Sequence, residues 1–346
     1  MKKSALSIVL GLSLAIGWVS MAGAAEEKHF PAPTTLSPEM TASVTAASPP
    51  LWLNGVAKPA DITPIAKAYA ESAAKAAIDM AARYGVKLEE TTLGGVPAWV
   101  LTPANLSSEK AGKVIFHIHG GGYILGHGAA GTGEAILMAA HEGYKIVSVD
   151  YRMAPEHPYP AAIDDAFKAY RALLEKVPAK NIAVFGTSTG GAMTLILGIQ
   201  AAEAGVDMPA ALISGTPWSD MDKVGDTYYT NEHVDNILVT YDGLIKSAVE
   251  AYAGKNDLRD PHISPVYADD KILAKFPPTL LVSGTRDLFL SNTVRMHERL
   301  LLADAHAELI VYEAISHAQY YLNEKAPETR KHYRLLGKFL ERTLLK

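Results

Sequence analysis

The chain has 346 residues, enough for one large α/β domain or two smaller ones with a sizeable buried core. Apolar residues make up 49% and charged residues 20% of it, a balance typical of globular rather than disordered proteins. The net charge of −5 argues against a nucleic-acid-binding surface, and the absence of cysteine excludes disulfides, thiolate metal sites and a cysteine nucleophile.

The first 24 residues have the pattern of a secretory signal peptide. Lys2 and Lys3 precede an apolar segment over 5–19, and the small residues Ala-Gly-Ala follow at 22–24. The alternative is a membrane anchor, but a spanning helix needs about 20 apolar residues. We therefore predict cleavage after Ala24, export to the periplasm or the medium, and no stable membrane anchor in the mature protein.

Beyond the signal, the elements change in character along the chain. Six prolines between residues 25 and 59 predict little regular structure, and the alanine-rich segment 65–84 predicts a helix that Gly85 ends. Short β-rich runs then alternate with helical segments, which predicts a mostly parallel sheet with helices on both faces. The predicted strands are 98–101, 114–119, 146–149, 182–185, 211–213, 279–282 and 309–312, and the predicted helices include 161–175, 192–204 and 292–302.

The alternation stops between Pro217 and Asp260, where aromatic residues collect. A connection of this length is unusual within a compact domain. We predict that residues 217–260 are an insertion that forms a cap over the sheet.

The sequence GTSTGG at 186–191 stands between a predicted strand ending at Phe185 and a predicted helix. A G-x-S-x-G turn of this kind exposes its serine, Ser188, at the carboxyl edge of the sheet, where it can act as a nucleophile. A Cβ at Gly186 or Gly190 would collide with the neighbouring strand and helix. The alternative is an ordinary strand-to-helix turn, but the flanking elements favour the nucleophile.

A serine nucleophile needs a base that an acid orients, and in this architecture both follow the serine along the chain. Asp287 lies in the loop after strand 279–282 and His317 in the loop after strand 309–312, so both reach the edge that carries Ser188. The alternatives are an ordinary loop aspartate and an ordinary loop histidine. The rivals fit less well: His297 within a helix, His306 before the last strand, His332 in the terminal helix, and Glu313 too close to its strand end.

Three consecutive glycines, Gly120–Gly122, follow His119 at the end of strand 114–119. They free main-chain N–H groups to face a developing negative charge, and the amide of Thr189 can add another. The alternative is a phosphate-binding loop, but the chain has neither G-x-x-x-x-G-K-[ST] nor a G-x-G-x-x-G followed by the acid that binds a ribose. We interpret His119 as a structural hydrogen-bonding residue, because the glycines separate it from any oxyanion.

Together these stretches resemble the hormone-sensitive-lipase branch of the α/β-hydrolases, the bacterial family IV esterases. The resemblance rests on HGGG at 119–122 within FHIHGGGYILG, DYRMAPEHPYPAA at 150–162 and GTSTGG at 186–191, with weaker matches in TPWSD at 216–220 and DPHISPVYAD at 260–269. It implies the α/β-hydrolase fold: a mostly parallel central sheet, helices on both faces and a helical cap. The N-terminal arm and cap helices would occupy 25–90, and the catalytic domain 91–346 with the cap insertion at about 217–260.

The same resemblance implies roles for individual residues. The triad would be Ser188, Asp287 and His317, the oxyanion N–H groups those of Gly121, Gly122 and Thr189, and the loop braces Glu156 and Asp165. Two positions depart from the family pattern. Thr189 replaces the usual alanine, so its β-branched side chain is expected to crowd the oxyanion corner, and Ala318-Gln319 replaces the usual Gly-Phe after the histidine.

The predicted function is therefore that of a serine carboxylesterase for short- to medium-chain acyl esters. It would act on a small-molecule ester through an acyl-enzyme, without a metal or an organic cofactor. The family often forms homodimers, although no motif in this chain demands one. The same triad would also serve a lactonase, a thioesterase or an amidase. A further alternative is a non-catalytic ligand-binding protein, like the plant hormone receptors that are similar to this family and lack its catalytic histidine.

Overall fold

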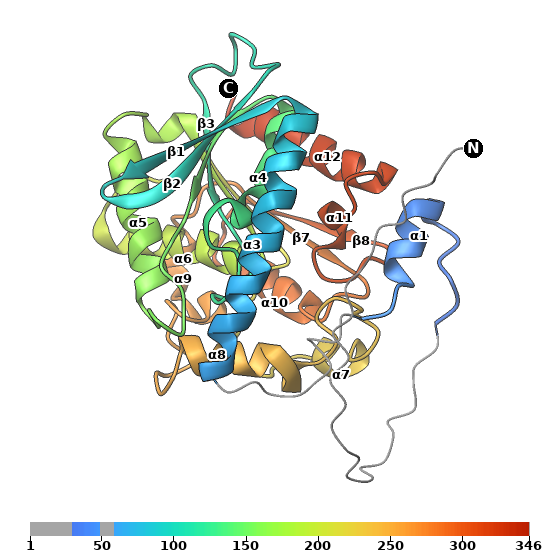
Figure 1. The fold of residues 1–346 in the computed structure, drawn as a ribbon. Helices are drawn as coiled ribbons and strands as arrows, with labels where there is room; N and C mark the ends of the chain where they lie inside the picture. The colour runs from blue at the N-terminus through green and yellow to red at the C-terminus, as the bar shows by residue number, and fades with distance from the viewer. Residues whose placement is uncertain (1–29, 49–58, 346) are drawn as a thin grey trace, which may run out of the picture.

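The computed structural model of the chain describes residues 30–48 and 59–345 (Figure 1). These residues form an eight-stranded sheet in the order β1-β2-β4-β3-β5-β6-β7-β8. β1 and β4 pair antiparallel with β2, and every other neighbouring pair is parallel, as the predicted fold class requires. The strands are β1 (Val86–Leu93), β2 (Val96–Pro103), β3 (Val114–Ile118), β4 (Lys145–Val149), β5 (Ile182–Thr187), β6 (Ala211–Gly215), β7 (Thr279–Gly284) and β8 (Ala307–Tyr312).

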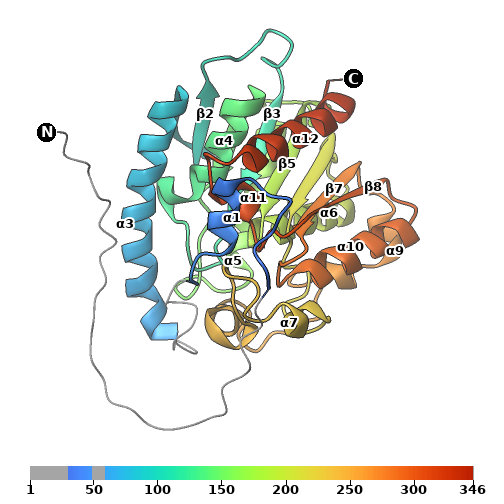
Figure 2. The ribbon, with the colours of Figure 1, turned by 90° about the vertical axis from the view of Figure 1, so that its right-hand side faces the viewer.

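Helices cover both faces of this sheet (Figure 2). On β3, Phe116 and Ile118 belong to the apolar cluster that also contains residues of α5, α6 and α10, whereas Ile115 belongs to the second cluster, with residues of α4 and α12. This alternation is the side-chain period of two of a β-strand, and apolar residues on both faces are typical of parallel strands. The helices are α1 (Pro38–Val44), α3 (Pro59–Tyr84), α4 (Gly133–Glu142), α5 (Ala161–Leu174), α6 (Thr189–Ala204), α7 (Thr227–Thr230), α8 (Lys246–Tyr252), α9 (Asp270–Leu273), α10 (Leu290–Leu302), α11 (Gln319–Leu322) and α12 (Pro327–Thr343).

The N-terminal segment corrects one expectation. Residues 25–59 were predicted to have little regular structure, yet α1 forms within them. Ser37 caps this helix by accepting a hydrogen bond from the Met40 N–H, and Pro38 occupies the first helical position, where its missing N–H costs nothing. Glu328 of α12 then accepts hydrogen bonds from both the N–H and the hydroxyl of Ser37, which anchors α1 to the fold.

The amino end of α3 lies beside α8, below the sheet in Figure 1. Both helices belong to segments that we assigned to the cap, 25–90 and 217–260, although the domain boundaries themselves stay a prediction. The predicted signal peptide lies outside the described residues. Within the described part of the chain, no helix is long and apolar enough to cross a membrane.

Candidate active site

Ser188 occupies the sharp turn between β5 and α6. Its φ of 64° and ψ of −122° place it in a region that residues with a side chain rarely adopt. The Ser188 N–H donates to the Gly215 carbonyl at the end of β6 (2.8 Å), and its carbonyl accepts from the N–H groups of Ala192 (3.0 Å) and Trp218 (3.2 Å). These main-chain bonds hold the strained turn in place and leave the side chain at the carboxyl edge of the sheet.

The glycines of this turn are required by close packing, as predicted. A Cβ at Gly186 would meet the Ile118 carbonyl oxygen at the end of β3 and, at 2.6 Å, the carbonyl group of Gly190 in α6. A Cβ at Gly190 would meet the same Ile118 oxygen and the carbonyl carbon and oxygen of His119, both at 2.8 Å. Since these neighbours are main-chain atoms, neither position can accept a side chain without a shift of the strand that precedes the glycine run.

The structure brings Asp287 and His317 into direct contact, although they lie in the loops after different strands, β7 and β8. His317 Nδ1 is 3.0 Å from Asp287 Oδ1, and both side chains are buried. The Asp287 carboxylate also accepts hydrogen bonds from Ser283 Oγ (2.6 Å), the Thr216 hydroxyl and the Phe289 N–H (2.8 Å). Burial alone would raise the pKa of Asp287, but His317 and the hydroxyl donors lower it below its ordinary value.

Ser188 and His317 line the same cavity. The hydrogen bonds among the described residues include none between the serine hydroxyl and the imidazole, so the contact that the sequence predicted between them is not closed in this structure. Hydrogen bonds of this kind are often long in free enzymes and shorten when substrate binds. The rival histidines at 297, 306 and 332, and Glu313, do not line the cavity.

Gly121 and Gly122 lie at the cavity wall with φ values of 122° and 66°. A Cβ at Gly121 would meet the Leu125 carbonyl oxygen, so this left-handed turn requires glycine. Among the described residues, the N–H groups of Gly121, Gly122 and Thr189 donate to no acceptor. Three main-chain donors without a partner at this edge of the sheet provide what an oxyanion would need.

Thr189 follows Ser188 directly, and His119 precedes the glycine run. Thr189 does not crowd the oxyanion corner: its side chain is fully buried at the start of α6 and does not line the cavity, which corrects the sequence-based expectation. His119 does have a structural environment. Its ring stacks on Tyr151 with centroids 4.2 Å apart, and its Nδ1 is 2.8 Å from the Gly120 carbonyl oxygen. Burial lowers the pKa of His119 to about 4, so the ring is neutral at pH 7.

Asp165 and Glu156, which were expected to brace loops, each bind another segment of the chain. Asp165 accepts hydrogen bonds from the main-chain N–H of Arg152 (3.0 Å) and from its guanidinium Nε and Nη2 (both 2.8 Å). Glu156 accepts from the hydroxyl of Thr63 on α3 (2.7 Å). Both carboxylates therefore hold chain segments together rather than face the cavity.

The cavity has a volume of about 520 Å³ and a mostly apolar wall. This volume is in the range of small-molecule sites. α3 supplies one side and residues 237–248 of the insertion another, so both segments assigned to the cap contact this space. The wall includes Tyr69, Ala73 and Met80 from α3, Leu238, Leu244 and Ala248 from the insertion, and Trp218 and Phe289 near Ser188.

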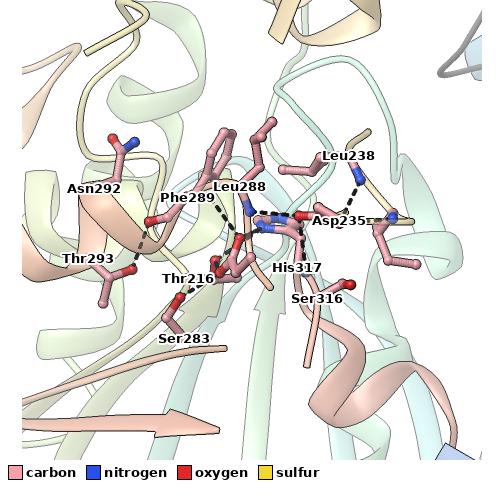
Figure 3. Close-up of polar contacts among 12 residues, drawn as sticks. Thr216, Asp235, Leu238, Ser283, Leu288, Phe289, Asn292, Thr293, Ser316 and His317 are labelled. Atoms are coloured by element: carbon pink, nitrogen blue, oxygen red, sulfur yellow. Dashed lines mark hydrogen bonds and ion pairs between the residues drawn. The ribbon is translucent and has the colours of Figure 1, made fainter. Parts of the chain in front are cut away.

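Sequence reasoning missed the role of Asp235, a fully buried residue of the insertion (Figure 3). Its Oδ1 accepts from the N–H groups of Ile237 (2.9 Å) and Leu238 (3.1 Å). Its Oδ2 accepts from the N–H groups of Leu288 (2.8 Å) and His317 (3.3 Å). Burial, followed by the nearby Asp287 carboxylate, raises the pKa of Asp235 to about 6. Figure 3 shows Asp235 and Thr216 on either side of His317.

Gln319, one of the departures from the family pattern, has a defined place. Its side-chain oxygen accepts from the Ser316 N–H (3.1 Å), and its amide nitrogen donates to Asn236 Oδ1 (2.8 Å) and to the Ser43 carbonyl of α1 (3.1 Å). It therefore joins the histidine loop to the insertion and to the N-terminal segment. The part of the chain that the structure describes contains no group of three or more His, Cys, Asp or Glu side chains that could hold a metal ion.

The fold is that of an α/β-hydrolase. Residues 115–321 match the alpha/beta hydrolase fold family, and the chain belongs to that family. It is 30% identical over 227 residues to an esterase of Acinetobacter venetianus, covering 64% of this chain and 72% of the relative. It is 27% identical over 255 residues to an acetyl-hydrolase of Streptomyces hygroscopicus, covering 72% and 84%.

Solved structures agree with these relatives. The crystal structure of the esterase E25 is 38% identical, with a TM-score of 0.87 over 93% of this chain and 99% of that chain. A hormone-sensitive lipase from a metagenome library is 29% identical, with a TM-score of 0.70 over 83% and 99%. The chain is therefore a carboxylic ester hydrolase of the hormone-sensitive-lipase-like branch, the bacterial family IV esterases.

Proposed function

We propose that the chain hydrolyses short- to medium-chain acyl esters through a triad of Ser188, His317 and Asp287. The observation that carries this proposal is the buried His317–Asp287 hydrogen bond of 3.0 Å, beside a strained serine turn on the same cavity. In this role, His317 accepts the serine proton as the hydroxyl attacks the ester carbonyl. Asp287 fixes the imidazole tautomer with its proton on Nδ1 and stabilises the cation that forms.

The tetrahedral intermediate would place its oxyanion against the unpartnered N–H groups of Gly121, Gly122 and Thr189. Loss of a single donor of this kind typically costs about 3 kcal/mol of transition-state stabilisation. His317 then protonates the leaving alcohol. Water, deprotonated by the same imidazole, releases the acid from the acyl-enzyme and restores Ser188.

The preference for short to medium acyl chains is supported by the cavity. A largely apolar space of about 520 Å³, closed on two sides by α3 and the insertion, suits a small ester better than the surface of a lipid aggregate. The relative from Streptomyces hygroscopicus, which is named an acetyl-hydrolase, supports the same proposal. For p-nitrophenyl esters we expect kcat/KM to be highest for acetyl to octanoyl chains and to fall for palmitoyl.

The decisive variant is Ser188→Ala, with Ser107→Ala in an exposed loop as the matched control. Hydrolysis of p-nitrophenyl acetate should be lost in the first and unchanged in the second, while circular dichroism shows both folded. Covalent labelling by a fluorophosphonate should mark the wild-type chain and fail with Ser188→Ala. Full activity in folded Ser188→Ala would end the triad assignment, and an unlabelled wild-type chain would favour a binding protein. Faster turnover of lactones, thioesters or amides than of simple esters would correct the substrate class.

A further inference from the structure

Asp235 is a buried carboxylate that the steps above do not use. Its two oxygens accept four main-chain N–H groups from three separate segments: its own turn, the loop that carries Asp287 and the loop that carries His317. We propose that Asp235 is a positioning residue for the triad, which aligns the acid and base loops with the cap and whose charge stabilises the His317 imidazolium during catalysis. The inference rests on the proposed triad.

The alignment follows from the contacts of one atom. Asp235 Oδ2 accepts from the N–H of Leu288, directly after Asp287, and from the N–H of His317 itself. The main chain at both partners of the 3.0 Å His317–Asp287 bond is thus fixed to a single point. If the Asp235 carboxylate moves, the His317 imidazole and the Asp287 carboxylate lose their mutual orientation. A misplacement of about 1 Å can lower a catalytic rate about a hundredfold.

The Asp235 carboxylate also binds main-chain groups of the insertion beside the cavity. Its other oxygen holds the N–H groups of Ile237 and Leu238, and both of these residues line the cavity. The wall that would contact an acyl or alcohol group and the loops that would carry out the chemistry therefore share one anchor. Asp235 links the insertion to the reaction through its side chain rather than through a contact with substrate.

The negative charge of Asp235 also lies close to His317 and Asp287. The ion pairs among the described residues give it no lysine or arginine partner. The titratable groups that act on it are Asp287, from the loop after β7, and His317, from the loop after β8. A second buried carboxylate beside Asp287 is unfavourable in the resting site, but it attracts the positive charge that forms when His317 accepts the serine proton. Since that proton arrives only as the reaction proceeds, the interaction is stronger in the transition state than in the free enzyme.

Asp235→Asn tests the alignment of the loops and the effect of the charge together, because an amide has nearly the same shape, no charge and only one acceptor oxygen. In either orientation its NH2 group faces two main-chain N–H donors. We expect kcat to fall by about tenfold to a hundredfold, since a lost hydrogen bond to a buried charge typically has this effect, with a much smaller change in KM.

Asp220→Asn is the matched control. Asp220 is also a fully buried aspartate of the insertion, but its carboxylate binds Tyr267 (2.8 Å) and Arg295 (2.7 Å) and contacts neither the Asp287 loop nor the His317 loop. This variant should lower the melting temperature and leave kcat near that of the wild-type chain. Asp235→Glu, which keeps the charge but displaces the carboxylate, should lower kcat at a KM similar to that of the wild-type chain.

The variants of Asp235 and Ser188 test the positioning role and the triad separately. An Asp235→Asn chain with kcat within twofold of wild type overturns the inference, as does a loss of kcat that Asp220→Asn matches. If Asp235→Asn does not fold, Asp235→Glu decides: lower kcat at similar KM supports the positioning role, and unchanged kcat refutes it. Activity retained by Ser188→Ala would instead remove the proposed triad, whatever the Asp235 variants do.

Discussion

Thr216 follows β6 directly, and its hydroxyl donates to Asp287 Oδ2 while lying 3.0 Å from His317 Nδ1. Thr216→Val removes this hydroxyl and keeps the β-branched shape in a fully buried site, so packing changes little. Asp287 retains its bonds to Ser283, Phe289 and His317. The variant thus measures what one of four donors contributes to the orientation of Asp287, the acid of the proposed triad.

A hydrogen bond to a charged group contributes about 1.5 to 3 kcal/mol, and each 1.36 kcal/mol changes a rate about tenfold. Because three other donors still orient the carboxylate, we expect the lower end: kcat/KM about tenfold below wild type. The free energy of unfolding should fall by about 1 to 3 kcal/mol, since a buried carboxylate loses a partner. Initial rates with p-nitrophenyl butyrate and urea unfolding measure the two quantities.

The pH dependence of stability gives a second check. The pKa of Asp287 is lowered in the folded chain, so its stabilising contribution is present above the ordinary aspartate pKa of about 4 and is lost as the pH falls through the folded value. Thr216→Val raises that folded pKa, so the difference in stability from wild type should shrink below about pH 4.

The control for this variant is Thr279→Val. Thr279 is equally buried, but it lies at the opposite end of the sheet, at the start of β7, and its hydroxyl donates to the Pro277 carbonyl (2.8 Å). It should keep full activity. Wild-type kcat/KM in Thr216→Val, or an equal loss of activity in Thr279→Val, would refute the claim that the Thr216 hydroxyl orients the acid.

Two further predictions concern packing and protonation. Gly190→Ala should destabilise the fold by about 1 to 3 kcal/mol and abolish activity, because its Cβ meets main-chain atoms at the end of β3. Gly112→Ala is the control, because no atom lies within 4 Å of the added Cβ. Thermal melts and rate assays should show no change in this control. Burial lowers the pKa of His332 to about 3, so its neutral ring favours folding above about pH 6.5 and this contribution is lost as the pH falls. In the wild-type chain, the free energy of unfolding should therefore decline between pH 6.5 and 4.5, and His332→Gln should reduce the slope of this decline by about 1.4 kcal/mol per pH unit. Urea titration at each pH measures the slope. An unchanged slope would contradict the assignment of a neutral buried ring.

The sequence predicted those parts of the fold whose signals are local and strong. The apolar run 182–185 lies within β5, and the run 279–282 lies within β7, because buried parallel strands are apolar on both faces. β1 was not predicted. It lies at the edge of the sheet, most of its residues are at least partly exposed, and Glu89 and Glu90 interrupt its apolar pattern. α4 was also missed, since a helix buried almost all round has no amphipathic period to detect.

The site divides in the same way. The residues of the proposed triad, Ser188, Asp287 and His317, could be selected because each follows a strand end, and the same rule applied to β6 would have found Thr216. Asp235 follows no strand, and with Ile237 and Leu238 it has the sequence appearance of an aspartate that closes its own turn. Its other two partners lie 53 and 82 residues away. A carboxylate that already accepts hydrogen bonds from its neighbours gives no sign in the sequence that it also binds two distant loops, so the role proposed for Asp235 could be inferred only from the fold.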